Sequence, residues 1–192
     1  MILFKVFFWI SVLLVAYSYI LYGLLIWILV KLRTIFFKNR FHSDSNYTPS
    51  VTLLVAIFNE EDIIRQKIEN SLKIQYPQDK LDILFITDGS TDNTNNIIKE
   101  YNQIKLLYEP ERKGIIAAIN RAMQYVKTPI VVFCDANALL NKECITEIAR
   151  HYADPKTGGV SGEKIVREMT PEKTTAGAGE GLYWQYESFL KK

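Results

Sequence analysis

The sequence predicts an α/β fold, a mostly parallel β-sheet with helices on both faces, preceded by one N-terminal transmembrane helix. Two observations carry this prediction. Short apolar runs alternate with amphipathic stretches along residues 51–152, the pattern of a parallel sheet covered by helices. Before them, Val6 to Val30 form a stretch without one charged side chain. With 192 residues, 48% of them hydrophobic, the chain is long enough for one domain with its own core.

The N-terminal stretch is long enough to cross a bilayer, since a helix over Val6–Val30 reaches about 37 Å. A cleaved signal peptide is the alternative, but the stretch exceeds a usual signal core and no small-residue cleavage pattern follows it. Four basic residues follow the stretch: Lys31, Arg33, Lys38 and Arg40. Only Lys5 and the amino terminus precede it, so the charge bias predicts a single-pass anchor in the cell membrane with the remainder in the cytoplasm. We expect the anchor and its basic flank in 1–40 and a polar linker in 41–50.

Beyond the linker, four short apolar runs bounded by polar residues are typical of buried strands. They are VTLLVAIF (51–58), LDILFIT (81–87), IKLLY (104–108) and PIVVFC (129–134). Helical patterns lie between and after them, at 60–73, 92–101, 115–126 and 141–152. The first helical pattern places four apolar residues on one stripe: Ile63, Ile64, Ile68 and Leu72. Right-handed crossovers then bring the carboxyl ends of all strands to one edge of the sheet.

A polar segment follows each predicted strand: NEED, DGSTDN, EPERKG and DAN. Ligands of open α/β sheets bind at this edge, so these segments are candidate binding loops. Structural roles compete with binding: Gly89 suits a turn, Ser90, Thr91 or Asp92 suits a helix cap, and the acids of NEED suit a first helical turn. Asp88 is not needed for capping and could accept from a base N–H or a ribose hydroxyl. Arg112 and Lys113 beside a glycine suit phosphate, although exposed basic loops are common.

Several other kinds of site are absent from the sequence. Neither a P-loop nor a G-x-G-x-x-G segment after the first strand is present, and GAGEG (177–181) is expected to be a flexible loop. Cys134 and Cys144 are the only cysteines, and we expect them to pack as small apolar residues without a disulfide. The net charge of +2, with acids and bases interspersed, argues against nucleic acid as a partner.

Four segments in this order and spacing resemble the donor-binding half of glycosyltransferase family 2, which has the Rossmann-like GT-A fold. They are VTLLVAIFNEE, DILFITDGSTDNT, RKGIIAAIN and VVFCDANA. The later GGVSGEKI (158–165) and EGLYWQYESFLKK (180–192) resemble the membrane-associated synthases of that family, those related to cellulose, chitin, hyaluronan and poly-N-acetylglucosamine synthases. The resemblance covers 51–192. It implies binding of a nucleotide-diphospho-sugar donor, usually UDP-linked, and inverting transfer of the sugar to an acceptor hydroxyl.

The resemblance also implies roles for individual residues. The segment after the first strand would line the nucleotide-base pocket: Ala56, Phe58, Asn59 and Glu60. Asp88 matches the aspartate that hydrogen-bonds the base, and Lys113 matches the basic residue near the base and diphosphate. DAN falls where the family carries its D-x-D metal motif, for Mg²⁺ or Mn²⁺ held against the diphosphate. Asp135 keeps the first acid, whereas Asn137 replaces the second with a neutral, weaker ligand.

One departure from the family concerns the acceptor. The family's general base, its Q-x-x-R-W motif and its later membrane helices are expected downstream of YWQYE, and the sequence contains none of them. Glu187 is a poor substitute base, because an acid in this segment is expected to face solvent. We therefore expect a truncated chain and keep two hypotheses: a membrane-anchored glycosyltransferase or part of one, and a non-catalytic donor-binding subunit. A second chain would then complete the acceptor half. A nucleotidyltransferase fits the sheet but not the anchor.

Overall fold

The computed structural model describes residues 2–36 and 43–163, and the predicted features at 177–192, Glu187 among them, lie outside these ranges. The chain divides into two compact units. One spans 41–162 and carries the sheet, and the N-terminal helices belong to the other.

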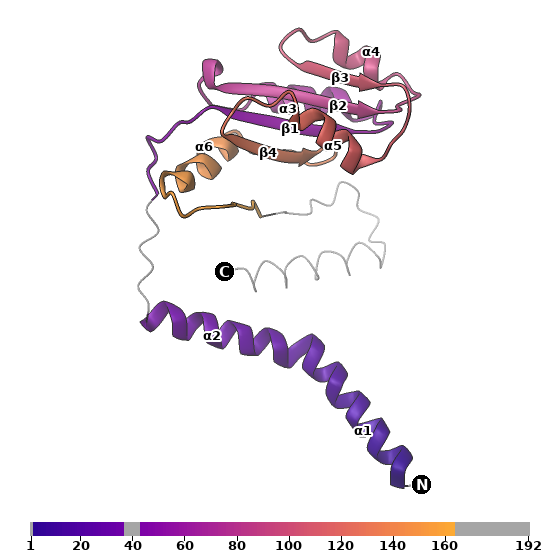
Figure 1. Ribbon diagram of the computed structural model, residues 1–192, viewed down its shortest axis with the longest axis vertical. Helices are drawn as coiled ribbons and strands as arrows, with labels where there is room; N and C mark the ends of the chain where they lie inside the picture. Colours follow the sequence, from indigo (N-terminus) through magenta and orange to yellow (C-terminus); the bar gives the residue numbers. More distant parts are fainter. Residues whose placement is uncertain (1, 37–42, 164–192) are drawn as a thin grey trace, which may run out of the picture. The chain divides into compact units, whose positions relative to one another are not determined.

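The N-terminal helical region is longer than the predicted Val6–Val30. Helix α1 (Ile2–Ala16), a π-helical turn (Tyr17–Leu21) and helix α2 (Tyr22–Phe36) follow one another without a break. Figure 1 shows a bend between α1 and α2, where the π-helical turn lies; π-helical insertions are a known cause of helix bends. Ile2–Tyr19 has a mean hydropathy of 1.9 and exposed side chains, and within the described ranges it is the one helix long and apolar enough to cross a membrane.

The sheet has four parallel strands, as predicted, and each predicted bound lies within one residue of the observed one. The strands are β1 (Val51–Ile57), β2 (Leu81–Asp88), β3 (Lys105–Glu109) and β4 (Ile130–Asp135). Their order is β3-β2-β1-β4. Val51 pairs with both Leu81 and Ile130, so β1 is an inner strand. Its sequence, VTLLVAI, contains no charged residue, as suits a strand with neighbours on both sides. The chain runs from β1 to β2 and β3 on one side of β1 and then crosses to β4 on the other side, which makes the carboxyl ends of β1 and β4 a topological switch point.

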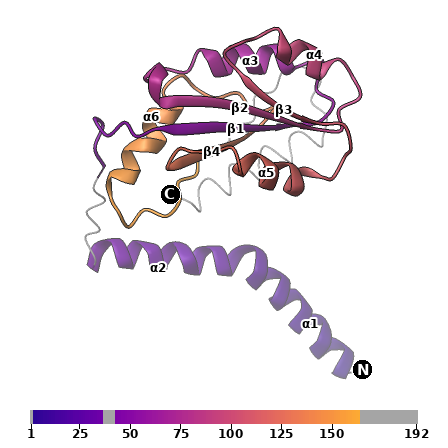
Figure 2. The ribbon, with the colours of Figure 1, turned by 45° about the horizontal axis from the view of Figure 1, so that its top comes forward.

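Helices cover both faces of the sheet, as predicted (Figure 2). Three helices pack on one face: α3 (Ile64–Leu72), α4 (Thr94–Lys99) and α6 (Cys144–Ala149). Helix α5 (Ile115–Met123) packs on the other face through Ala118 and Ala122. The larger core lies under α3, where Phe85 is fully buried. Burial of a side chain of this size stabilises the fold by about 1.5–3 kcal/mol.

All four helices are shorter than predicted, and the first differs most. Helix α3 begins at Ile64 because the preceding residues form a turn, in which the N–H groups of Ile63 and Ile64 donate to the carbonyl oxygen of Glu60. The acids of NEED therefore precede the helix, and the predicted first-turn role is wrong. The predicted apolar stripe is also partly wrong, since Leu72 is 37% exposed whereas Lys67 is fully buried.

The predicted cap of the second helix is observed in part. Asn93 is the N-cap residue of α4 and makes no side-chain capping hydrogen bond. Ser90, Thr91 and Asp92 instead hydrogen-bond to the loop that follows β1. Asp92 Oδ1 also accepts a hydrogen bond at 3.1 Å from the N–H of Thr94, the first residue of α4. The polar residues after β2 therefore join two loops, and one of them, Asp92, also satisfies a backbone donor at the start of the helix.

Candidate functional site

The carboxyl edge of the sheet gathers the predicted binding loops. Asp88 pairs with Glu109 at the ends of β2 and β3, and Asp135 pairs with Ala56 at the ends of β4 and β1. Paired residues of parallel strands share a face, so these four side chains lie on the face that α5 covers. The edge predicted from the strand order is therefore observed.

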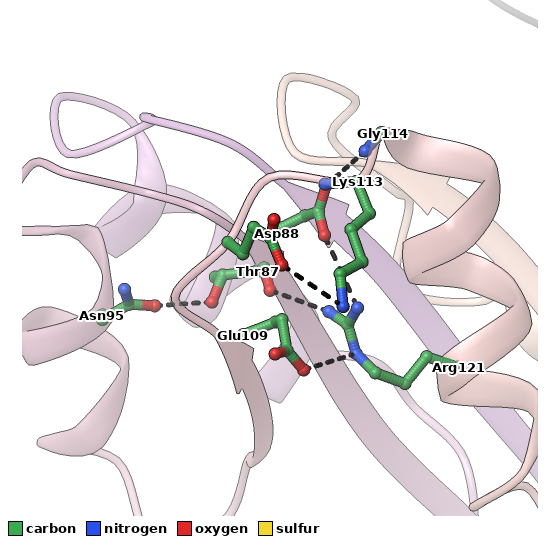
Figure 3. A network of polar contacts seen from close by, with 8 residues as sticks. Thr87, Asp88, Asn95, Glu109, Lys113, Gly114 and Arg121 are labelled. Atoms are coloured by element: carbon green, nitrogen blue, oxygen red, sulfur yellow. Dashed lines mark hydrogen bonds and ion pairs between the residues drawn. The ribbon is translucent and has the colours of Figure 1, made fainter.

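Asp88 holds the start of α5 in place. Its side chain is buried, and its Oδ2 accepts hydrogen bonds from the backbone N–H groups of Lys113, at 2.8 Å, and Gly114, at 2.6 Å (Figure 3). The carboxylate lies at the helix N-terminus, where the helix dipole favours a negative charge, and such charge-assisted hydrogen bonds are strong. The backbone N–H groups of Lys113 and Gly114, in the segment that the sequence suggested for phosphate, therefore donate to Asp88 in this structure.

Arg121 of α5 completes this network and is missing from the sequence-based assignment. Its Nη2 donates to the Thr87 carbonyl oxygen at 3.2 Å, and its Nη1 lies 3.5 Å from Asp88 Oδ1. Its Nε lies 3.9 Å from a carboxylate oxygen of Glu109. The sequence contains one signal for this role. Arg121 is the single basic residue of the largely apolar segment IIAAINRAM, and two strands end in acids, Asp88 and Glu109. Arg121 ties the ends of β2 and β3 to α5.

A pocket of about 210 Å³ opens between the end of β1 and the start of α5. Its lining combines apolar side chains with one acid and one base: Ala56, Ile57, Phe58, Asp88, Arg112, Gly114, Ile115 and Ala118. The guanidinium carbon of Arg112 lies 3.9 Å from the centroid of the Phe58 ring, a cation–π contact. The pocket thus brings together four of the residues singled out in the sequence, Ala56, Phe58, Asp88 and Arg112.

Asn59 and Glu60 do not line this pocket and instead hold two loops together. Asn59 has a positive φ of 51°, and its Oδ1 accepts from the backbone N–H of Thr91 at 2.8 Å. The backbone N–H of Glu60 donates to Thr94 Oγ1 at 2.9 Å. Lys113 is a pocket neighbour whose side chain is half exposed, with its Nζ 3.6 Å from Glu111. The sequence-assigned residues therefore divide into pocket-lining and loop-joining groups.

Asp135, the last residue of β4, and Asn137, just beyond the strand, are both exposed, with the buried Ala136 between them. A carboxylate and an amide oxygen are ligand types that suit Mg²⁺ or Mn²⁺. Within 2–36 and 43–163, no three or more His, Cys, Asp or Glu side chains are grouped to hold a metal ion. The pair fits a cation that takes most of its other ligands from a bound molecule such as a diphosphate.

Comparison with known proteins agrees with this geometry. Residues 52–189 match the family model for glycosyl transferase family 2, which is most of the chain. The chain belongs to this family. Poly-beta-1,6-N-acetyl-D-glucosamine synthase of Staphylococcus aureus is 30% identical over 124 residues, covering 62% of this chain and 30% of the relative. Beta-monoglucosyldiacylglycerol synthase of Nostoc sp. is 27% identical over 135 residues, covering 67% and 29%. The chain thus spans about 30% of the length of these relatives.

Solved structures show the same fold as this family-2 chain. The mannosyltransferase PcManGT from Pyrobaculum calidifontis, in complex with GDP-Man and Mn²⁺, superposes with a TM-score of 0.64 at 28% identity. The match covers 78% of this chain and 45% of that one. The S. aureus TarS structure with UDP-GlcNAc, at 24% identity and a TM-score of 0.51, covers 64% and 38% and shows likeness of fold. The predicted GT-A architecture is confirmed.

Proposed function

We propose that this chain is the donor-binding part of a membrane-anchored, inverting glycosyltransferase that uses a UDP-linked sugar. The observation that carries the proposal is the pocket at the carboxyl end of β1, with Asp135 exposed on the neighbouring strand. Its volume of about 210 Å³ is below the roughly 300–1,000 Å³ of sites for whole drug-sized ligands. It suits the base of the donor, and the diphosphate would extend toward Asp135.

The residues divide the work of binding the donor. Phe58 and Arg112 would offer flat surfaces to the base, and Ala56 leaves room beside them. Asp88 keeps acceptor capacity on Oδ1, its less engaged oxygen, for a base N–H. Lys113, exposed at the pocket rim, would pair with phosphate. Asn59 and Glu60 would act through the loop they hold, next to Phe58.

Asp135 and Asn137 would hold the divalent metal, Mg²⁺ or Mn²⁺, together with the phosphate oxygens. When bound, such a cation neutralises charge that develops on the departing diphosphate. Asp135 supplies the one carboxylate of this motif, so binding of metal and of donor should be mutually dependent. PcManGT, solved with a nucleotide sugar and Mn²⁺, supports this pairing by similarity.

The organisation we propose assigns 1–40 to a membrane anchor with its basic flank, 41–50 to a linker and 51–192 to the donor-binding domain. The exposed apolar helix Ile2–Tyr19 supports the anchor. The membrane and the nucleotide-sugar donor are then the partners of this chain, and a second chain would complete the acceptor site.

Calorimetric titration of the full chain in detergent micelles with UDP tests the donor site. We expect UDP to bind more tightly with Mn²⁺ than with EDTA, and Asp135→Ala to remove this difference, because loss of a metal ligand lowers metal affinity. Asp82→Ala is the matched control, since Asp82 is an exposed acid near the amino end of β2. Equal binding with Mn²⁺ and EDTA in the unmodified chain would contradict the proposal.

A second measurement separates an enzyme from a donor-binding subunit. Release of UDP from UDP-N-acetylglucosamine by the full chain would indicate transfer or hydrolysis. Binding of the donor without release of UDP would favour the non-catalytic subunit. A chain that lacks the general base is expected to be slow, because general-base catalysis typically contributes 10²- to 10⁴-fold in rate.

A further inference from the structure

Lys67 is a fully buried lysine on α3, in a position that the apolar stripe of the helix did not predict. Burial of an ammonium group costs free energy unless the group is paired or well hydrogen-bonded. Within the described ranges Lys67 forms no ion pair with a carboxylate, since each ion pair there involves other residues. Its burial therefore has to be explained by the groups that its Nζ does contact.

The contacts of Lys67 lie on either side of the turn that carries Asp135 and Asn137. Its Nζ donates to the carbonyl oxygen of Ala138 and lies 2.9 Å from Cys134 Sγ. Cys134 directly precedes Asp135, and Ala138 directly follows Asn137. One buried ammonium group therefore bridges the two ends of the turn from the α3 side of the sheet.

Few other contacts hold this turn. The backbone N–H of Ala138 donates to the Asp135 carbonyl oxygen at 3.3 Å, a long hydrogen bond, and the Ala136 side chain is buried. Cys134 Sγ, a weak donor, lies 3.5 Å from the Asp135 carbonyl oxygen and 3.6 Å from that of Ala138. Asn70, three residues after Lys67 on the same helix, holds the segment beyond the turn. Its side chain donates to the Leu140 carbonyl oxygen at 2.7 Å and accepts from the Leu140 N–H at 2.8 Å. Helix α3 thus contacts this loop at two points. Asn70 binds Leu140, and Lys67 binds the turn that carries Asp135 and Asn137.

We propose that Lys67 is a positioning residue, which fixes the turn so that the oxygens of Asp135 and Asn137 face the bound donor and its metal. This inference rests on the proposed function. A turn that is already fixed spares the metal the cost of ordering its ligands, as preorganised sites do. The effect matters in this chain because Asn137 is a neutral ligand and leaves Asp135 as the single acid of the motif.

Replacing Lys67 by methionine tests the inference, because methionine has a similar length and no charge. Lys67→Met removes the cost of burying an unpaired ammonium group and also removes the hydrogen bond to Ala138, so we expect the variant to fold with a Tm close to that of the unmodified chain. We expect the Mn²⁺ concentration for half-maximal UDP binding to rise roughly tenfold, as for loss of an outer partner of metal ligands. UDP binding in EDTA should not change. Lys73→Met is the matched control, since Lys73 is an exposed lysine at the end of α3.

Hydrogen exchange gives a second readout that needs neither metal nor donor. We expect the Ala138 amide of the metal-free Lys67→Met chain to exchange faster than in the unmodified chain, while the Leu140 amide, held by Asn70, keeps its protection. An unchanged Mn²⁺ dependence would overturn the inference. So would UDP binding that weakens equally with and without metal, or a variant that no longer unfolds cooperatively, because Lys67 would then support the fold in general. If the unmodified chain shows no metal-dependent UDP binding, the proposed function fails, and hydrogen exchange alone decides whether Lys67 positions the turn.

Discussion

The buried acid Asp88 is the residue on which the candidate site depends. Its carboxylate accepts from two backbone N–H groups at the start of α5 and faces Arg121, so it fixes the wall of the pocket. The next residue, Gly89, has a φ of 69° and donates its N–H to the Glu109 carbonyl oxygen at 2.9 Å. The chain turns at this glycine to bring Asp88 and the loop before α5 together.

Gly89 tolerates no side chain in this position, which gives a prediction at the residue scale. A Cβ on Gly89 would lie 2.7–2.9 Å from Arg112, two of the close contacts being to its backbone. Because the positive φ adds strain, we expect Gly89→Ala to lower the free energy of unfolding by at least about 1 kcal/mol and to weaken UDP binding. Chemical unfolding and titration measure the two effects. Gly158→Ala is the control, since nothing lies within 4 Å of its Cβ position; equal stability of the two variants would show that the loop yields without cost.

At the scale of elements, the loops after β1 and β2 form one unit. Asp92 accepts from the backbone N–H of Glu61 at 3.1 Å and of Thr94 at 3.1 Å, while Glu61 accepts from the N–H of Asn93 at 2.9 Å. Burial raises the pKa of Asp92, but the hydrogen bonds from Thr94 and Glu61 outweigh burial and leave the pKa below its ordinary value. The ionised form of Asp92 therefore stabilises the folded state.

This shift gives the stability a predictable pH dependence. A carboxyl group whose pKa is lowered by folding contributes fully above its unfolded pKa of about 3.9, and the contribution is lost as the pH falls through the folded pKa. We expect Asp92→Asn to be less stable than the unmodified chain by about 1 kcal/mol at pH 7, and the difference to shrink below pH 4. Urea unfolding across this pH range checks it. Asp62→Asn, at an exposed acid nearby, should show no such trend; a difference for Asp92→Asn that is independent of pH would refute the assignment.

The same elements show which parts of the fold a sequence can predict. The strands were predicted within one residue because buried parallel strands leave short, unbroken apolar runs with polar ends. The start of α3 was missed because Glu60 to Ile63 form a turn whose residues look helical in composition. Lys67 and Arg121 were missed because the reach of a long side chain to another strand or loop depends on packing, which local periodicity does not contain.

At the scale of the whole molecule, the sheet unit and the N-terminal helices belong to separate compact units, and they differ in where their apolar side chains lie. The sheet unit buries its apolar side chains in two clusters, one on each face. The described part of the N-terminal helical region instead exposes its apolar side chains, including Trp9, Leu13 and Leu24. Exposed apolar surface of this extent is what the proposed membrane anchor requires, because a helix in a lipid bilayer faces an apolar phase.

The orientation of the proposed membrane anchor is the remaining prediction. Because Lys31 and Arg33 follow the apolar stretch and Lys5 alone precedes it, we expect the sheet unit on the cytoplasmic side. Protease added outside intact cells should leave the sheet unit uncut, whereas protease added to inverted membrane vesicles should digest it. Changing Lys31 and Arg33 to glutamate should raise the fraction of the sheet unit that is cut in intact cells, because it removes part of the positive charge that retains the flank in the cytoplasm.

The matched control changes Lys127 and Lys142 to glutamate. These lysines of the sheet unit are far from the apolar stretch in sequence, so the orientation should stay as it was. Digestion of the unmodified chain in intact cells would place the donor pocket on the side that lacks nucleotide sugars and would contradict both the orientation and the anchor's proposed role.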